Sequence, residues 1–134
     1  MRNLGSSRSI RLGLVVVVAA AFLVVAAAAL SGVAQQQKTI VAVKAGTPTE
    51  LKFAPASKTV LKSAGPLTVA FTVTNKGKLK HDFKIAGKKT LLIAPGATRT
   101  LVVAFAKTGR FQYICTVLGH AAAGMKGTLT VRRA

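Results

Sequence analysis

Acidic residues are nearly absent from this chain. Its 134 residues include two, Glu50 and Asp82, against 20 lysines and arginines, which gives a formal net charge of +18 at pH 7. A catalytic zinc site usually has a carboxylate close by, and here only Asp82 lies near a histidine in the sequence, so a zinc enzyme is disfavoured. The positive charge suits a solvated surface or, more specifically, attraction to an acidic protein, anionic lipid or wall polymer.

Cysteine occurs once, as Cys115. One cysteine excludes an intramolecular disulfide. It also excludes a lipid anchor on an N-terminal cysteine, because no cysteine directly follows the apolar stretch described below. An unpaired cysteine in an exported chain needs an explanation, and metal ligation is one.

Aromatic residues are few as well, with six Phe, one Tyr and no Trp. The phenylalanines fall at alternating positions that point inward in a sheet, so they do not form the stacking platforms typical of single-stranded nucleic-acid binders. Despite the positive charge, we therefore expect no nucleic acid among the partners of this protein.

A long hydrophobic run occurs once, at 12–30, where 19 residues carry no charge. Arg2, Arg8 and Arg11 precede it, and Ser-Gly-Val-Ala at 31–34 follows, with small residues at the places that a signal peptidase reads, which is the pattern of an export signal. We expect an apolar helix, cleavage after Ala34 and a domain at 35–134. An uncleaved anchor is the alternative, because a spanning helix needs about 20 residues. Either way the domain is placed outside the cytoplasmic membrane, in the periplasm, secreted or anchored.

Helical periodicity is missing after position 30, and β-branched alternation with Gly and Pro turns replaces it. The clearest strand, 67–74, alternates between apolar and polar positions as a half-buried strand of an antiparallel sheet does. About eight short strands and no repeat or linker predict one all-β domain, a sandwich or barrel. The expected strands are 39–43, 50–53, 58–62, 67–74, 81–85, 91–93, 99–105, 110–115 and 128–131.

What the chain does contain is a compact set of metal-binding side chains near its C-terminus. Cys115, His120 and Met125 are spaced by five residues each, and His81 lies 34 positions before the cysteine. A trigonal site of two histidines and one cysteine with a long axial methionine is the arrangement of blue-copper electron-transfer centres. Alone, each of these residues is more often a packing residue, but all the soft and nitrogen donors after position 34 occur in this one set.

Other chemistries fit the same residues less well. Zinc prefers four strong ligands, and thioether is a poor one. A two-copper centre would need a second cysteine. A nucleophilic Cys115 paired with a histidine would leave Met125 without a role. One copper ion is therefore the expected cofactor.

The sequences YICTVLGH at 113–120 and GMKGTLTV at 124–131 resemble those of the cupredoxins, the type 1 blue copper proteins. The spacing C-x4-H-x4-M is similar to that of the rusticyanin and auracyanin branch, and the segments 75–77 and 81–83 also match. The resemblance covers 39–131. It implies a Greek-key β-sandwich of about eight strands in which His81, Cys115 and His120 are equatorial copper ligands and Met125 is the axial ligand.

The resemblance also implies roles for neighbouring residues. Asp82 would pin the ligand loop by hydrogen bonds, with Asn75 and Thr116 beside it in the layer around the ligands. An apolar electron port around His120 would consist of Leu118, Ala121, Ala122 and Ala123. A basic rim at the same end would consist of Lys76, Lys78, Lys80 and Lys126. Many relatives have proline where this chain has Leu118 and Lys80.

The function expected from these patterns is an exported one-electron carrier, not an enzyme, that docks on an acidic redox partner. The runner-up is an accessory protein that binds or delivers copper through the same ligands. A third class, a metal-free module for polyanions, predicts that Cys115→Ser leaves the activity intact.

Overall fold

A computed structural model of the chain describes residues 36–134, and this part contains nine strands and no helix. The all-β prediction is therefore confirmed for the domain. No helix within residues 36–134 has the length and apolarity needed to cross a membrane. The apolar helix expected at 12–30 and the cleavage site expected after Ala34 lie outside the described residues.

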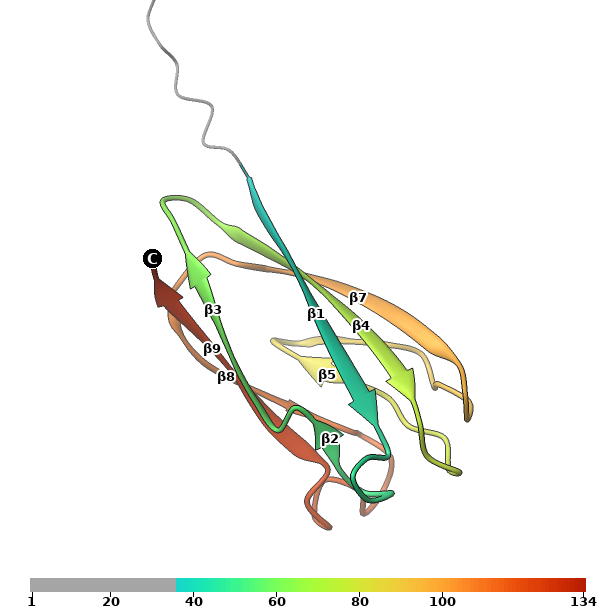
Figure 1. Ribbon diagram of the computed structural model, residues 1–134. Coiled ribbons are helices and arrows are strands. Elements are labelled where there is room, and N and C mark those ends of the chain that lie inside the picture. The colour runs from blue at the N-terminus through green and yellow to red at the C-terminus, as the bar shows by residue number, and fades with distance from the viewer. Residues whose placement is uncertain (1–35) are drawn as a thin grey trace, which may run out of the picture. The chain divides into compact units, whose positions relative to one another are not determined.

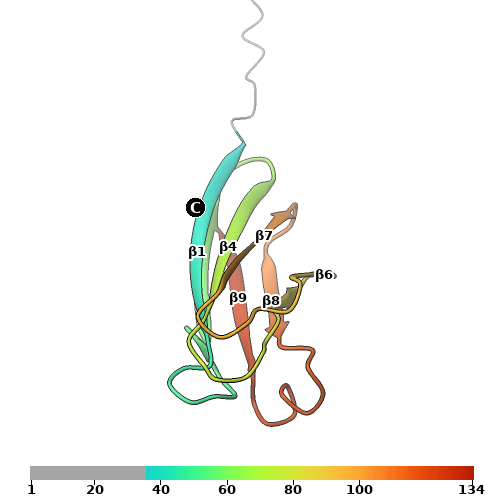
Figure 2. The same cartoon turned by 90° about the vertical axis from the view of Figure 1, so that its right-hand side faces the viewer.

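The strands form two sheets that pack face to face (Figures 1 and 2). The chain passes repeatedly between the layers, as a Greek-key sandwich requires: β3 lies in one sheet and β4 in the other. The first sheet has the order β2 (Phe53–Ala54), β1 (Gln37–Ala45), β4 (Leu67–Asn75) and β7 (Thr98–Phe105). The second has the order β3 (Ser57–Lys62), β9 (Lys126–Arg133), β8 (Gly109–Ile114), β5 (Lys84–Ile85) and β6 (Lys88–Lys89).

The central strand β4 differs from its prediction. It pairs antiparallel with β7 but parallel with β1, so its sheet is mixed. Its outer face is covered only in the first half, where Thr68 and Ala70 are buried and Ala70 is 7% exposed, whereas Thr72 and Thr74 are partly exposed as predicted. Ala70 lies in register between Ile40 and Val102, which remain 70% and 49% exposed. These two larger side chains flank Ala70 and shield it from water. Alternation within a single strand cannot predict this burial, because it depends on the neighbouring strands.

Three of the expected strands are shorter than predicted. Only the last residue of 50–53 joins a strand, because Glu50 and Leu51 lie in a turn. The segments 81–85 and 91–93 pair through a single bridge between His81 and Ile93, and β5 begins only at Lys84. There Phe83 donates its amide hydrogen to the Thr90 hydroxyl, so a side chain replaces a ladder partner.

The core lies between the sheets and includes a group of edge-on and tilted aromatic rings. Phe53, Phe71, Phe83 and Tyr113 are all buried, and neighbouring ring centroids lie 5.1–5.7 Å apart. Such offset contacts are the favoured geometry for aromatic pairs. Phe83 and Tyr113 each lie two residues from a predicted ligand, so this rigid core supports the backbone from which those ligands extend.

Candidate metal centre

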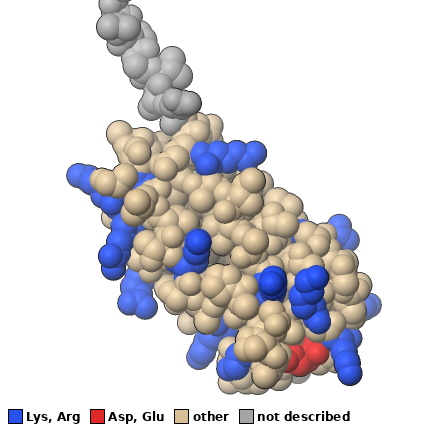
Figure 3. Space-filling view, in the orientation of Figure 1, with Lys and Arg blue, Asp and Glu red and all other residues tan. Residues whose placement is uncertain are grey.

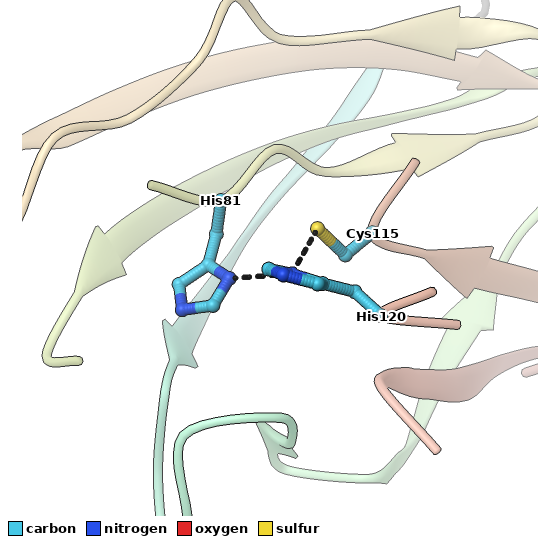
Figure 4. A group of neighbouring side chains, drawn as sticks. All are labelled: His81, Cys115 and His120. Atoms are coloured by element: carbon cyan, nitrogen blue, oxygen red, sulfur yellow. Dashed lines mark hydrogen bonds between the residues drawn. The ribbon is translucent and has the colours of Figure 1, made fainter. Parts of the chain in front are cut away.

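His81, Cys115 and His120 meet in space although 34 residues separate the first two (Figure 4). One donor atom from each lies within 4.8 Å of the others. The two Nδ1 atoms are 3.2 Å apart, and the Cys115 Sγ atom is 3.5 Å from Nδ1 of His120. The sequence predicted that these three side chains meet in space, and this prediction is confirmed.

These separations suit one metal ion. Bonds from first-row metals to nitrogen and sulfur measure roughly 2.0–2.3 Å, so three donors in a plane around one ion stand roughly 3.5–3.7 Å apart. The observed Nδ1–Nδ1 and Sγ–Nδ1 distances of 3.2 and 3.5 Å need only small adjustments to reach that geometry. One thiolate and two imidazoles are the donor set for copper that carries electrons.

Cys115 is positioned by strand β8. Alternate residues of this strand face the core, and Tyr113 and Cys115, on that face, are buried. The Cys115 amide donates to the carbonyl oxygen of Met125 at 3.1 Å, so the two ends of the ligand loop are bonded to each other. The side chain of Cys115 therefore enters the site from a fixed backbone.

His120 lies in the turn between β8 and β9. Its amide donates to the Val117 carbonyl at 3.0 Å, and its own carbonyl accepts the Met125 amide at 2.9 Å. Gly119 has a φ of 81°, a conformation that glycine adopts without strain. These hydrogen bonds close the loop into a compact turn. His120 is the one partly exposed member of the trio.

His81 is buried and reaches the site from the first half of the domain. Its amide and carbonyl pair with those of Ile93 at 3.2 and 2.7 Å. The Asn75 side chain donates to the carbonyls of Leu79 and Ile93 at 2.7 and 2.8 Å and accepts the Gly77 amide at 2.8 Å. Asn75 thus ties the loop before His81 to the segment that pairs with it.

Asp82 and Thr116 connect the chain segments that carry the two buried ligands, His81 and Cys115. The Asp82 carboxylate accepts hydrogen bonds from the backbone amide and the hydroxyl of Thr116. The Lys89 ammonium lies 3.7 Å from the same carboxylate and 3.4 Å from the Thr116 hydroxyl oxygen. Since Asp82 follows His81 and Thr116 follows Cys115, these bonds hold the two ligand-bearing segments together.

Met125 is fully buried at the start of the return strand. Its backbone bonds to both Cys115 and His120 place it at the closing point of the ligand loop. The role of its sulfur as an axial ligand stays a prediction, which a substitution tests below.

Glu50 is the functional candidate that sequence reasoning missed. Its Oε1 atom lies 2.9 Å from Nε2 of His81, on the opposite side of the ring from Cys115 and His120. The same carboxylate accepts the amides of Lys78 and Leu79. Only the scarcity of acids pointed to Glu50, because its distance of 31 residues from the histidine matches no motif.

The electrostatics of the site differ between its two sides. Hydrogen bonds from the backbone of Lys78 and Leu79 lower the pKa of Glu50 to about 2, with His81 adding to the effect. Burial raises the pKa of the Cys115 thiol, and hydrogen bonds from the backbone of Asp82 and Val117 oppose that shift in part. At neutral pH the metal-free site therefore contains an ionised Glu50 and a protonated thiol.

The residues predicted for the surface around the site are accessible, or partly so. Leu118 is 98% exposed, Ala122 and Ala123 are exposed, and Ala121 is half-buried. The predicted basic rim is exposed at each of its four positions, Lys76, Lys78, Lys80 and Lys126. One face of the molecule shows many basic side chains and a single small acidic patch near its lower end (Figure 3).

The sequence and the fold both place this domain among known copper proteins. Residues 30–132 match the family described as copper binding proteins, plastocyanin/azurin family. The chain belongs to this family, the cupredoxins. Its copper cofactor follows from this membership together with the trio of His81, Cys115 and His120.

A curated relative is the copper-resistant cuproprotein CopI of Rubrivivax gelatinosus, 29% identical over 120 residues, which cover 74% of this chain and 69% of that protein. Similar solved structures include auracyanin B, with a TM-score of 0.59, 22% identity and coverage of 72% and 89% of the two chains. The auracyanin of Roseiflexus castenholzii has a TM-score of 0.55, 20% identity and coverage of 72% and 98%. Auracyanin A of Chloroflexus aurantiacus has a TM-score of 0.53 and 22% identity, and the match covers 70% of this chain and 98% of that chain.

Proposed function

We propose that this protein is a one-electron carrier, with no catalytic activity of its own, that uses a single copper ion held by His81, Cys115, His120 and Met125. One observation supports this proposal above the others. Within the trio, His81 and Cys115 are buried and only His120 reaches the surface. An electron can pass along the ring of His120, whereas an ion that leaves must first open the closed loop.

Copper bound in this site supplies a couple between its cupric and cuprous states. The chain's own contribution is to hold the ligands in nearly the same place in both states. The backbone amide of Cys115 is bonded to Met125 and that of His120 to Val117. Asp82 joins the segment of His81 to the segment of Cys115. A small rearrangement on electron transfer keeps the barrier to the transfer low, because little of the site needs to reorganise.

The exposed surface suits brief docking. Leu118, Ala122 and Ala123 are exposed apolar residues close to His120 in the sequence. Lys76, Lys78 and Lys80 are exposed in the loop before His81, and Lys126 is exposed directly after Met125. We propose an acidic redox protein as the partner, because opposite charge raises the association rate. Anionic lipid or wall polymer is a second surface that these lysines fit. The electron-transfer rate between the two proteins should fall steeply as salt is added.

The export pattern at 1–34 leads us to propose that the domain works outside the cytoplasmic membrane. Its single cysteine suits that location, because it cannot form an intramolecular disulfide and the proposed copper ion would occupy it. Fractionation of cells that produce the full-length chain tests this proposal, and recovery in the cytoplasm would contradict it.

Copper handling is the second candidate. It is favoured by the likeness to a protein named for copper resistance. The same ligands would then bind copper for storage or delivery, and the partly exposed His120 would be the first ligand to detach. This candidate predicts transfer of the ion itself to an acceptor.

Spectroscopy and electrochemistry of the copper-loaded protein separate these functions. Both copper roles predict an intense blue absorption that Cys115→Ser abolishes, because thiolate-to-copper charge transfer causes the colour. An unchanged spectrum would eliminate the site. Reversible one-electron voltammetry with fast self-exchange supports the carrier, whereas slow exchange together with rapid loss of copper to an acceptor supports the handling role.

A further inference from the structure

We propose that Glu50 is a positioning residue for copper: its carboxylate fixes the orientation and tautomer of His81 and thereby favours the cupric state. The inference rests on the copper site described above but not on whether electrons or copper ions leave the protein. It assigns a role to Glu50, the second of the two acidic residues. The first, Asp82, already binds the segment that carries Cys115, through Thr116.

The contact is built from four donor–acceptor pairs. Oε1 of Glu50 lies 2.9 Å from the amide nitrogen of Leu79 and 2.9 Å from Nε2 of His81. The Lys78 amide is shared between the two carboxylate oxygens at 2.9 and 2.8 Å. A carboxylate held by two backbone amides cannot rotate freely, so the position of the oxygen that faces His81 is fixed by the loop.

Two glycines make room for this contact. A Cβ atom on Gly77 would lie 2.2 Å from Oε1 of Glu50, well inside contact distance. A Cβ atom on Gly46 would lie 2.5 Å from Cα of Gly77, and Gly46 has a φ of 73°. The turn after β1 and the loop after β4 therefore approach each other closely, and the carboxylate lies where no side chain intrudes.

The geometry dictates the protonation pattern of His81. A carboxylate that already accepts amide hydrogens acts as an acceptor, so Nε2 of His81 must carry the hydrogen. The other nitrogen, Nδ1, then presents its lone pair toward His120 and Cys115, as Figure 4 shows for the ring orientation. Metal-bound histidines commonly donate their second N–H to a carboxylate or carbonyl, which raises the basicity of the ligand.

A purely structural role for Glu50 is the competing explanation, because the bonds to Lys78 and Leu79 alone would stabilise the loop. The two explanations differ in what copper senses. A negative charge in contact with a ligand stabilises the more highly charged metal ion more, so Glu50 should hold the reduction potential down. A loop brace alone leaves the potential unchanged.

The test compares the full-length protein with Glu50→Gln, Glu50→Asp and Ser63→Lys. Glutamine preserves size but removes the charge, aspartate preserves the charge at shorter reach, and Ser63→Lys makes the same change in net charge at an exposed site in the β3–β4 loop. We expect Glu50→Gln to weaken cupric relative to cuprous binding about tenfold. That ratio raises the potential by about 59 mV for a one-electron couple. Glu50→Asp should fall between this variant and wild type.

A measurement on metal-free protein makes the result independent of copper loading. Long-range proton–nitrogen NMR spectra of the histidine rings should show His81 as the Nε2–H tautomer with a slowly exchanging hydrogen, and Glu50→Gln should speed that exchange. A wild-type protein that never turns blue with Cu(II) would overturn the copper site and this role with it. A blue wild type whose potential shifts equally in Glu50→Gln and Ser63→Lys would overturn the role of Glu50 alone.

Discussion

Asp82 and Thr116 each follow a buried ligand of the trio, and they bond to each other through both the amide and the hydroxyl of the threonine. The Asp82 carboxylate is almost completely buried, so its two acceptor oxygens are matched to these donors rather than to water. This pair joins the segment of His81 to the segment of Cys115 without either ligand taking part.

Asp82→Asn should therefore weaken the connection between the segments of His81 and Cys115. The amide keeps one acceptor but loses the charge, and hydrogen bonds to charged groups contribute about 1.5–3 kcal/mol. We expect the free energy of unfolding of the metal-free protein to fall by roughly that amount and the reduction potential to rise. Denaturant titration and voltammetry measure the two effects.

Lys89→Met is the matched control for Asp82→Asn. It removes the half-exposed Lys89 ammonium, which pairs with Asp82 and contacts the Thr116 hydroxyl, but leaves both hydrogen bonds from Thr116 to Asp82. Exposed pairs contribute only about 0–1 kcal/mol. Equal losses of stability in the two variants would show that the ion pair, and not the bonds to Thr116, holds the segments together.

The sandwich, Cys115 and His120 follow from local patterns in the sequence. His81 does not: it was predicted because it is the chain's one other histidine and because 81–83 resembles the cupredoxins. Strict alternation placed Tyr113 and Cys115 on the same inner face, and the loop spacing placed His120 beside them. Glu50 could not be found that way. Its role depends on the close approach of Gly46 and Gly77, which lie in loops 31 residues apart, and alternation within 50–53 predicted a strand where the structure has a turn.

Gly77→Ala separates the position of the Glu50 carboxylate from its charge. The new methyl group would overlap the Glu50 carboxylate at the end of its side chain, so the carboxylate should be pushed off its amide and His81 contacts while the backbone stays in place. We expect the potential to rise as in Glu50→Gln, by a smaller amount, although the net charge of the protein is unchanged.

The double variant with Glu50→Gln checks this reasoning. If Gly77→Ala acts only through the carboxylate, it should add little in the Glu50→Gln background, so the two shifts should be far from additive. Full additivity would mean that Gly77→Ala disturbs the site through the backbone instead.

Met125→Leu tests the predicted axial sulfur. Leucine has a similar volume, and such buried exchanges usually cost less than about 1.5 kcal/mol. Loss of a weak donor to the cupric ion should raise the potential and alter the blue absorption. Leu67→Met, an equally buried exchange at the start of β4, is the control for packing effects and should leave both unchanged. Matching shifts in the two variants would exclude the sulfur as a ligand.

Copper binding should release a proton at neutral pH. Burial raises the pKa of the Cys115 thiol, so the metal-free protein holds that proton until a metal replaces it. A pH indicator in weakly buffered solution should report about one proton for each Cu(II) bound. Cys115→Ser should release none, and an equal release from that variant would assign the proton to another group.

Tyr113 gives the domain a pH limit on the alkaline side. It is the only tyrosine in the chain, its ring is buried, and its hydroxyl donates to the carbonyl of Pro55. Burial raises its pKa from 10.0 to about 12. Below pH 10 the group is neutral in both folded and unfolded chains, so it has no effect on the pH dependence there.

Between pH 10 and pH 12 the unfolded chain loses the tyrosine proton while the folded protein keeps it. The free energy of unfolding should then fall by about 1.4 kcal/mol for each pH unit from this group alone. Tyr113→Phe should be less stable at pH 7, by about 1 kcal/mol for the lost hydrogen bond, but should show a shallower decline above pH 10. Ultraviolet titration of the native protein locates the transition directly, since no second tyrosine contributes, and a midpoint near 10 would mean that water reaches the ring.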